Sequence, residues 1–153
     1  MAHFALLDDN GIVQNIVLVS NEDLVDENGE ESEAIGIAFC ERVIGPGPWV
    51  QTSRNTRYGV HLHPDAFEPD GGVPLRANFA EIGYKYYAEL DIFAPAERPF
   101  DIPEWFELNL DGYWSCPVGL HPDTGQPLTP EQWEFLEVVF SQPTAVLNPD
   151  VRI

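Results

Sequence analysis

The stretch FALLDDNGIVQNIVLVS, residues 4–20, determines the first part of the fold. Asn10-Gly11 is the dipeptide that type I′ hairpin turns prefer, because both central residues of such a turn need a positive φ. β-branched residues, which are enriched in strands, follow at Ile12, Val13, Ile16, Val17 and Val19. The pattern predicts an antiparallel hairpin with strands over residues 3–8 and 12–19.

Two short helices are expected after this hairpin. Asn21 is suited to an N-cap, with Glu22 and Asp23 in the first turn and Gly29 at the end. Residues 31–45, ESEAIGIAFCERVIG, have an imperfect 3.6-residue period that Gly36 weakens. Residues 49–81 are then rich in Pro, Gly, Asp and Asn, which predicts a long loop with short extended pieces. Long ordered loops are usually functional or assembly segments.

Two similar blocks follow, GYKYYAELDIFAP at residues 83–95 and EWFELNLDGYWSCP at residues 104–117. Each has an aromatic-rich strand, an acidic turn, a second strand with an aromatic residue, and a proline. This predicts a hairpin module that is used twice. Proline-rich segments bound the blocks, and proline stiffens and extends a linker.

The second block has large apolar groups on both predicted faces. With Asp111-Gly112 at the centre of the turn, Leu110 opposes Tyr113 and shares its face with Leu108 and Phe106, while Trp105 and Trp114 lie on the other face. A lone hairpin is marginal in water, so the second face needs a cover, from this chain's own core or from a partner. Both alternatives remain open. The candidate partner-binding residues are Trp105, Phe106, Tyr113, Trp114, Tyr84, Tyr86, Phe93 and Trp133.

The segment LTPEQWEFLEVVFSQP, residues 128–143, predicts a further short helix. Thr129 is the expected N-cap, Pro130 the first helical residue and Gln132 the partner in a capping box. Trp133, Leu136 and Phe140 would then share one face. The expected fold class is α+β, mainly β, with antiparallel hairpins and one or two short helices. We expect residues 1–80 to hold the first hairpin, short helices and long loop, and residues 81–153 to hold the tandem aromatic hairpins and a C-terminal docking segment.

The charge of the chain excludes several kinds of partner. Its 153 residues carry a formal charge of −19, which repels phosphate backbones and anionic membrane surfaces. There is no apolar run long enough to span a membrane, and the start lacks the features of a signal peptide. We therefore expect neither a nucleic acid nor a membrane as partner. Cys40 and Cys116 are expected to be buried free thiols.

The sequence offers few groups for chemistry. His61 and His63 would project to one face of a strand, with Asp65 and the more distant His121 as further ligands. No zinc or calcium signature has the required spacing, so no metal site and no cofactor are predicted. Nucleophile-elbow, zincin and phosphate-loop motifs are also absent. No catalytic residue is predicted, and the chain is expected not to be an enzyme.

Four segments resemble a family of small virion-associated proteins of tailed phages, known especially from phages of cyanobacteria and other aquatic bacteria. They are MAHFALLDDNGIVQNIVLVSNED (1–23), WVQTSRNTR (49–57), EPDGGVPLRANFAEIGYKYYAELDIFAP (68–95), and EWFEL with YWSCP (104–117). The resemblance covers roughly residues 1–120. It departs at NFAEIGYKYY, where Ala-Glu replaces a small Ala-Gly pair, and in the C-terminal segment, where a further acidic hairpin is expected.

The resemblance implies a structural part of a phage particle with no known active site. We expect a capsid decoration or cement-type protein that acts through protein–protein contacts; the alternatives are a tail, baseplate or fibre-attachment component, or a module that binds host glycans. The expected partners are other virion proteins (major capsid or tail proteins) and copies of the chain itself, as a homo-oligomer such as a trimer. The expected location is the virion exterior, after assembly in the host cytoplasm.

Overall fold

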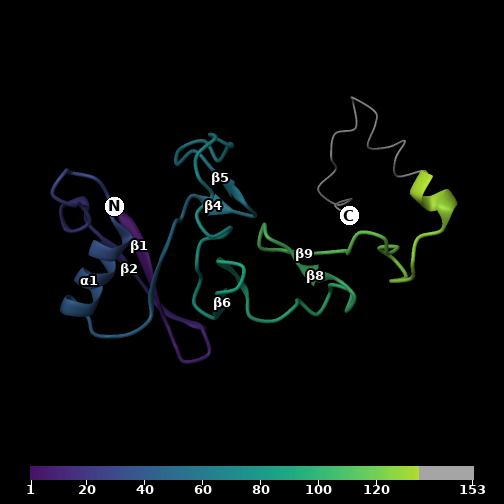
Figure 1. Ribbon diagram of the computed structural model, residues 1–153, viewed down its shortest axis with the longest axis horizontal. Coiled ribbons are helices and arrows are strands. Elements are labelled where there is room, and N and C mark those ends of the chain that lie inside the picture. Colours follow the sequence, from purple (N-terminus) through teal and green to yellow (C-terminus); the bar gives the residue numbers. More distant parts are fainter. Residues whose placement is uncertain (135–153) are drawn as a thin grey trace. The chain divides into compact units, whose positions relative to one another are not determined.

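The computed structural model describes residues 1–134, which are mainly antiparallel β-structure with α-helix α1 and a 3₁₀ turn (Figure 1). The predicted α+β, mainly β class is confirmed. The described residues form two compact units, the first from Met1–Glu97 and Leu110–Tyr113, and the second from Arg98–Asn109 and residues 114–134. The elements of the first unit are β1 (Ala2–Leu7), β2 (Val13–Val19), η1 (Asn21–Asp23), α1 (Glu33–Val43), β3 (Trp49–Thr52), β4 (Thr56–Arg57), β5 (Val60–His61), β6 (Tyr84–Tyr87) and β7 (Ile92–Pro95), and those of the second are β8 (Glu107–Leu108) and β9 (Trp114–Ser115).

The predicted first hairpin is present, with β1 and β2 antiparallel in a register that pairs Phe4 with Val17. Its turn differs from the prediction. Gly11 has a φ of +79°, whereas Asn10 keeps a negative φ, so the turn is not type I′. Instead the Gly11 amide donates to the carbonyl oxygen of Asp8 at 3.0 Å, which gives a type I turn followed by a left-handed glycine and a bulge. The Asp8 carboxylate fixes this turn, because it accepts from the amides of Asn10 and Ile12.

Strand β3 pairs with the other edge of β1, and helix α1 packs on this three-stranded sheet. The helix predicted over residues 31–45 is confirmed, and the Ser32 hydroxyl caps it by accepting from the Ile35 amide. A Cβ at Gly36 would lie 2.2 Å from the ring of Phe4. The glycine that weakens the sequence period therefore permits the helix to approach the sheet. The core between them contains Ala2, Phe4, Val19, Leu24, Cys40 and Trp49.

The other predicted helix, from Asn21 to Gly29, is wrong. Only the single 3₁₀ turn η1 forms there. The carboxylate of Asp26 accepts from the amides of Asn28 and Glu30, and a bridge joins Val25 to Glu31. Asp26 thus gives the backbone a turn in place of a helix.

A second core cluster joins the first hairpin to the β6–β7 hairpin. It contains Ala5, Leu7, Val13, Ala80 and Phe93. The expected boundary between residues 80 and 81 would divide this cluster. The first aromatic hairpin therefore belongs to the first compact unit, which continues to Glu97.

In the second unit, β8 and β9 form the second predicted hairpin, but its register differs from the prediction by one residue. Leu108 pairs with Trp114, and Glu107 pairs with Ser115. Residues Asn109–Tyr113 form the connection, in place of a two-residue Asp111-Gly112 turn. Leu108 and Trp114 consequently share a face, whereas the predicted register placed them on opposite faces.

The start of the predicted C-terminal helix lies inside the described residues. Residues 130–134 are helical. The Thr129 hydroxyl accepts from the Gln132 amide at 3.3 Å, and the Gln132 side chain accepts from the Thr129 amide at 2.8 Å. The predicted capping box is confirmed. Leu136, Phe140 and the docking segment beyond them lie outside the described residues.

Candidate protein-binding surface

The eight candidate partner-binding residues are divided between the two units. Tyr84, Tyr86, Phe93 and Tyr113 belong to the first, and Trp105, Phe106, Trp114 and Trp133 to the second. Trp133 is 40% exposed, whereas Phe93 is completely buried in the second core cluster. Phe93 therefore belongs to the core of its own unit rather than to a partner surface. The others are half-buried.

The tyrosines of the β6–β7 hairpin are used within their own unit. Tyr84 and Tyr86 pack against the second core cluster. The Tyr86 hydroxyl donates to the carboxylate of Asp91, and the Tyr87 hydroxyl donates to the carbonyl oxygen of Pro95. Burial raises the pKa of Tyr86, and its hydrogen bond to Asp91 raises it further. The hydroxyls of Tyr86 and Tyr87 therefore already have partners within the first unit.

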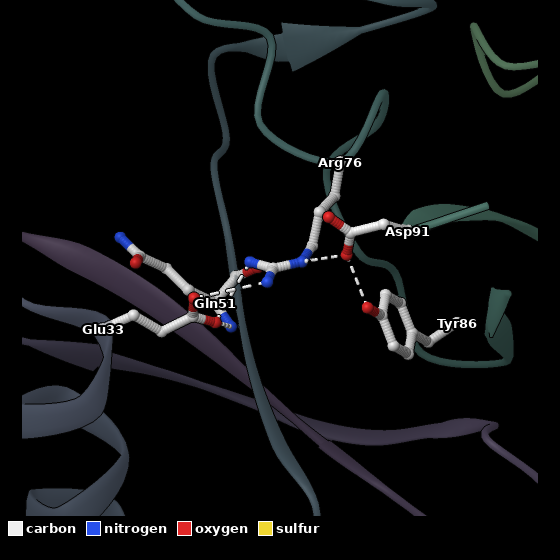
Figure 2. A network of polar contacts seen from close by, with 5 residues as sticks. All are labelled: Glu33, Gln51, Arg76, Tyr86 and Asp91. Carbon is white, nitrogen blue, oxygen red and sulfur yellow. Dashed lines mark hydrogen bonds and ion pairs between the residues drawn. The ribbon is translucent and has the colours of Figure 1, made fainter. Parts of the chain in front are cut away.

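Arg76 is the centre of a polar network that holds four segments of the first unit together (Figure 2). Its guanidinium donates to Asp91 at 2.8 Å, to the carbonyl oxygen of Gln51 at 3.0 Å and to Glu33 at 3.2 Å. Burial would lower the pKa of Arg76, but the Asp91 and Glu33 carboxylates outweigh this effect and raise it. For Asp91, burial would raise the pKa, while the hydrogen bonds from Tyr86 and Arg76 lower it overall. Every group is satisfied by another protein group, so the network is structural.

Asn78 fixes the adjoining turns of the first unit. Its side-chain amide donates to the carbonyl oxygens of Phe93 at 2.8 Å and Gly112 at 2.9 Å, and its oxygen accepts from the Tyr58 amide at 2.9 Å. The side chain is buried, so each of these bonds is made away from water. Asn78 thereby positions residues 58–59, which connect β4 to β5 with positive φ at both positions.

Two loops of the chain have the same sequence pattern and the same hydrogen bonds. The first LHPD loop is residues 62–69, LHPDAFEP, and the second LHPD loop is residues 120–127, LHPDTGQP. A bridge closes each loop, Leu62 with Pro69 and Leu120 with Pro127. His63 and His121 each accept at Nδ1 from the amide two residues later, at 3.1 Å. The shared His-Pro-Asp string is thus a loop-forming element, which the sequence showed only as a short repeat.

The histidines do not assemble a metal site. His61 is paired with Asp70, Nδ1 to Oδ1 at 2.7 Å, while His63 and His121 bond within their own loops. The Gly72 amide and His61 lower the pKa of Asp70. Within residues 1–134, no three His, Cys, Asp or Glu side chains are placed to hold a metal ion.

The first unit has a cavity of about 470 Å³ beside β5. Polar side chains make up much of its lining, including His3, Gln51, Arg54, Asn55 and His61. Burial and the charge of Arg54 lower the pKa of His3. The polar lining of the cavity suits a small polar solute.

The two thiols are free and buried, as predicted. Burial raises the pKa of both Cys40 and Cys116. A thiol is reactive as the thiolate, so neither cysteine is suited to act as a nucleophile.

Bulky apolar side chains are exposed at several positions outside helices and strands. Each of the following is more than two-thirds exposed: Phe67, Val73, Ile82, Phe100, Leu110 and Val118. None of them was among the predicted partner-binding residues, which are aromatic residues of the hairpin blocks and of the expected C-terminal helix. In the described part of the chain, no helix could span a membrane. Comparison with protein-family models, with curated proteins and with solved structures finds no match to this chain.

Proposed function

We propose that the chain is a non-enzymatic structural component of a phage particle, of the capsid decoration or cement type, that acts through protein–protein contacts. The observation that carries the proposal is the set of bulky apolar side chains on turns and loops, of which Phe67 and Phe100 are 79% and 100% exposed. A large apolar side chain that projects from the surface can be buried in a partner's pocket, where a few such anchors supply most of the binding energy. The resemblance of residues 1–120 to virion-associated proteins supports the particle as the place where that partner lies.

The charge of the chain supports a position on the outside of the shell. At −19, the protein is repelled by packaged DNA and attracted to cationic patches on the proteins around it. The proposed partners are major capsid or tail proteins, with copies of this chain arranged by the symmetry of the particle.

The aromatic residues offer less support for glycan binding. Stacking on sugars needs open aromatic faces, whereas the Trp105 indole donates to the carbonyl oxygen of Pro122 and its ring lies against Gly125. The Tyr113 ring packs edge-on against Tyr58 at 5.8 Å. These rings are therefore partly occupied within their own units.

The test is to purify particles of a phage that encodes the chain and to quantify the chain by mass spectrometry and cryo-microscopy. We expect the chain to co-purify through a density gradient, at a copy number proportional to that of the major capsid protein. A copy number that matches tail symmetry would replace decoration with the tail alternative. A chain that is abundant in lysates but absent from the purified particles would contradict a structural role.

A further inference from the structure

The two LHPD loops differ at the one position where their backbone enters the left-handed region. In the second loop this position is Gly125, with a φ of +70°, and in the first it is Phe67, with a φ of +54°. The amides of Phe67 and Gly125 donate to the carbonyl oxygens of His63 and His121, respectively. The backbones are therefore equivalent, and the first loop has a bulky residue where glycine is favoured.

The glycine of the second loop has a structural reason. A Cβ at Gly125 would lie 2.6 Å from the Trp105 ring, so this loop holds an indole of its own unit. The side chain of Phe67 is 79% exposed, and its ring makes no aromatic or cation–π contact recorded among residues 1–134.

Other non-glycine residues with positive φ have contacts that compensate for the strain. Tyr58 is held by Asn78 and packs against Tyr113. Arg76 and Asp91 bond to each other, and Ala77 is buried. Phe67 combines a strained backbone with an exposed ring. Such a combination suggests selection for a contact outside the unit.

The charge around Phe67 identifies the chemistry of that contact. Asp65, Glu68 and Asp70 surround it in the sequence, and no lysine or arginine occurs in residues 58–75. A second copy of this chain would bring the same acidic loop and a net charge of −19. A complementary surface instead has an apolar pocket with lysine or arginine at its rim.

We propose that Phe67 is the anchor with which the chain docks on another virion protein, entering an apolar pocket rimmed by cationic side chains. This inference rests on the proposed function. Phe67 supplies the buried centre of the contact, and Asp65 and Glu68 supply its charged rim.

The test uses particles of the encoding phage from which the chain is absent, by gene deletion or by stripping, and measures binding of the purified full chain. We expect Phe67→Gly, which keeps the loop's backbone geometry, to weaken binding by about tenfold or more. Val43→Ala, at an apolar residue of α1 that is 60% exposed and lies outside the set of loop side chains proposed to bind, is the control and should bind within about twofold of the wild type. Asp65→Asn with Glu68→Gln should weaken binding and reduce its salt dependence.

The outcomes distinguish this inference from the proposed function. Wild type and Phe67→Gly binding equally well would overturn the inference alone. A wild-type chain that binds no particle would overturn both. Self-association that depends on Phe67, measured by sedimentation without particles, would replace the cationic partner with a second copy. Thermal unfolding of Phe67→Gly at or above the wild-type temperature would show that lost binding is not lost folding.

Discussion

In the hairpin formed by β6 and β7, the second strand lies inside the core, with Ile92, Phe93 and Ala94 all buried. In the hairpin formed by β8 and β9, each strand has two residues, and Trp114 is only half-buried. Similar sequences thus give a strand that belongs to the core and a short hairpin near the surface. The difference comes from what each hairpin packs against. The β6–β7 hairpin packs against the sheet residues Ala5, Leu7 and Val13. In the second block, by contrast, the ring of Trp105 lies against the loop at Gly125.

The largest expected effect is at the buried centre of the β6–β7 hairpin. Phe93→Ala should lower the free energy of unfolding by about 3–5 kcal/mol, because it removes a fully buried ring and leaves a cavity. Urea unfolding followed by circular dichroism measures this. Trp114→Ala is the matched change in the second hairpin and should cost clearly less. Equal losses for the two variants would contradict the distinction between the hairpins.

Asn78 contacts the β6–β7 hairpin and the residues that connect β8 to β9. Asn78→Ala would leave the Tyr58 amide and the carbonyl oxygens of Phe93 and Gly112 without this partner. A loss of about 2–3 kcal/mol is expected, since buried polar groups would be left unsatisfied. The exposed Asn28 provides the control, and Asn28→Ala should change the unfolding midpoint little. A loss below about 0.5 kcal/mol at Asn78 would show that water replaces its bonds.

Gly125→Ala tests how the ring of Trp105, in the second block, is covered. The added methyl group would meet the Trp105 ring, and the left-handed backbone adds strain, so a loss of about 1–2 kcal/mol is expected. Gly29→Ala is the control, because Gly29 has a φ of +79° and nothing within 4 Å of an added Cβ. The excess loss at Gly125, together with a shift of tryptophan fluorescence, measures the packing of Trp105. Equal losses in both variants would mean that the ring moves aside freely.

The smallest effect concerns the acidic turn of the β6–β7 hairpin. The folded state lowers the pKa of Asp91. The contribution of Asp91 to folding stability is therefore complete above its unfolded pKa of about 4, and it is lost as the pH falls through its folded pKa. Asp91 is largely exposed, so the contribution is below about 1 kcal/mol. Asp91→Asn should reduce the loss of stability between about pH 5 and pH 2. Glu89→Gln, on the same turn, is the control; the same pH profile in wild type and Asp91→Asn would refute the assignment.

Local signals in the sequence were sufficient for the elements that depend on neighbours along the chain. The Asn10-Gly11 dipeptide and the β-branched residues after it predicted the hairpin of β1 and β2, and Thr129 with Gln132 predicted the capping box. The turn of that hairpin and the capping box involve residues a few positions apart, where local geometry alone sets the contact.

The errors arose where distant residues decide the conformation. The register of the β8–β9 hairpin differs from the prediction by one residue, and Gly112 in its connection bonds to Asn78, a contact that nothing in residues 104–117 encodes. Arg76 meets Glu33 across 43 positions, and the sequence gives no periodic sign of such a pair. Phe67 was missed because left-handed backbone is predicted from glycine or asparagine, and phenylalanine gives no such signal.

The division of the chain has a practical consequence for dissecting this protein. Residues Leu110–Tyr113 are part of the first unit although Arg98–Asn109 are not, so no single cleavage point yields both units whole. A recombinant fragment that stops at Glu97 would deprive Asn78 of the Gly112 carbonyl oxygen. Truncation experiments should therefore begin from fragments that extend beyond Tyr113.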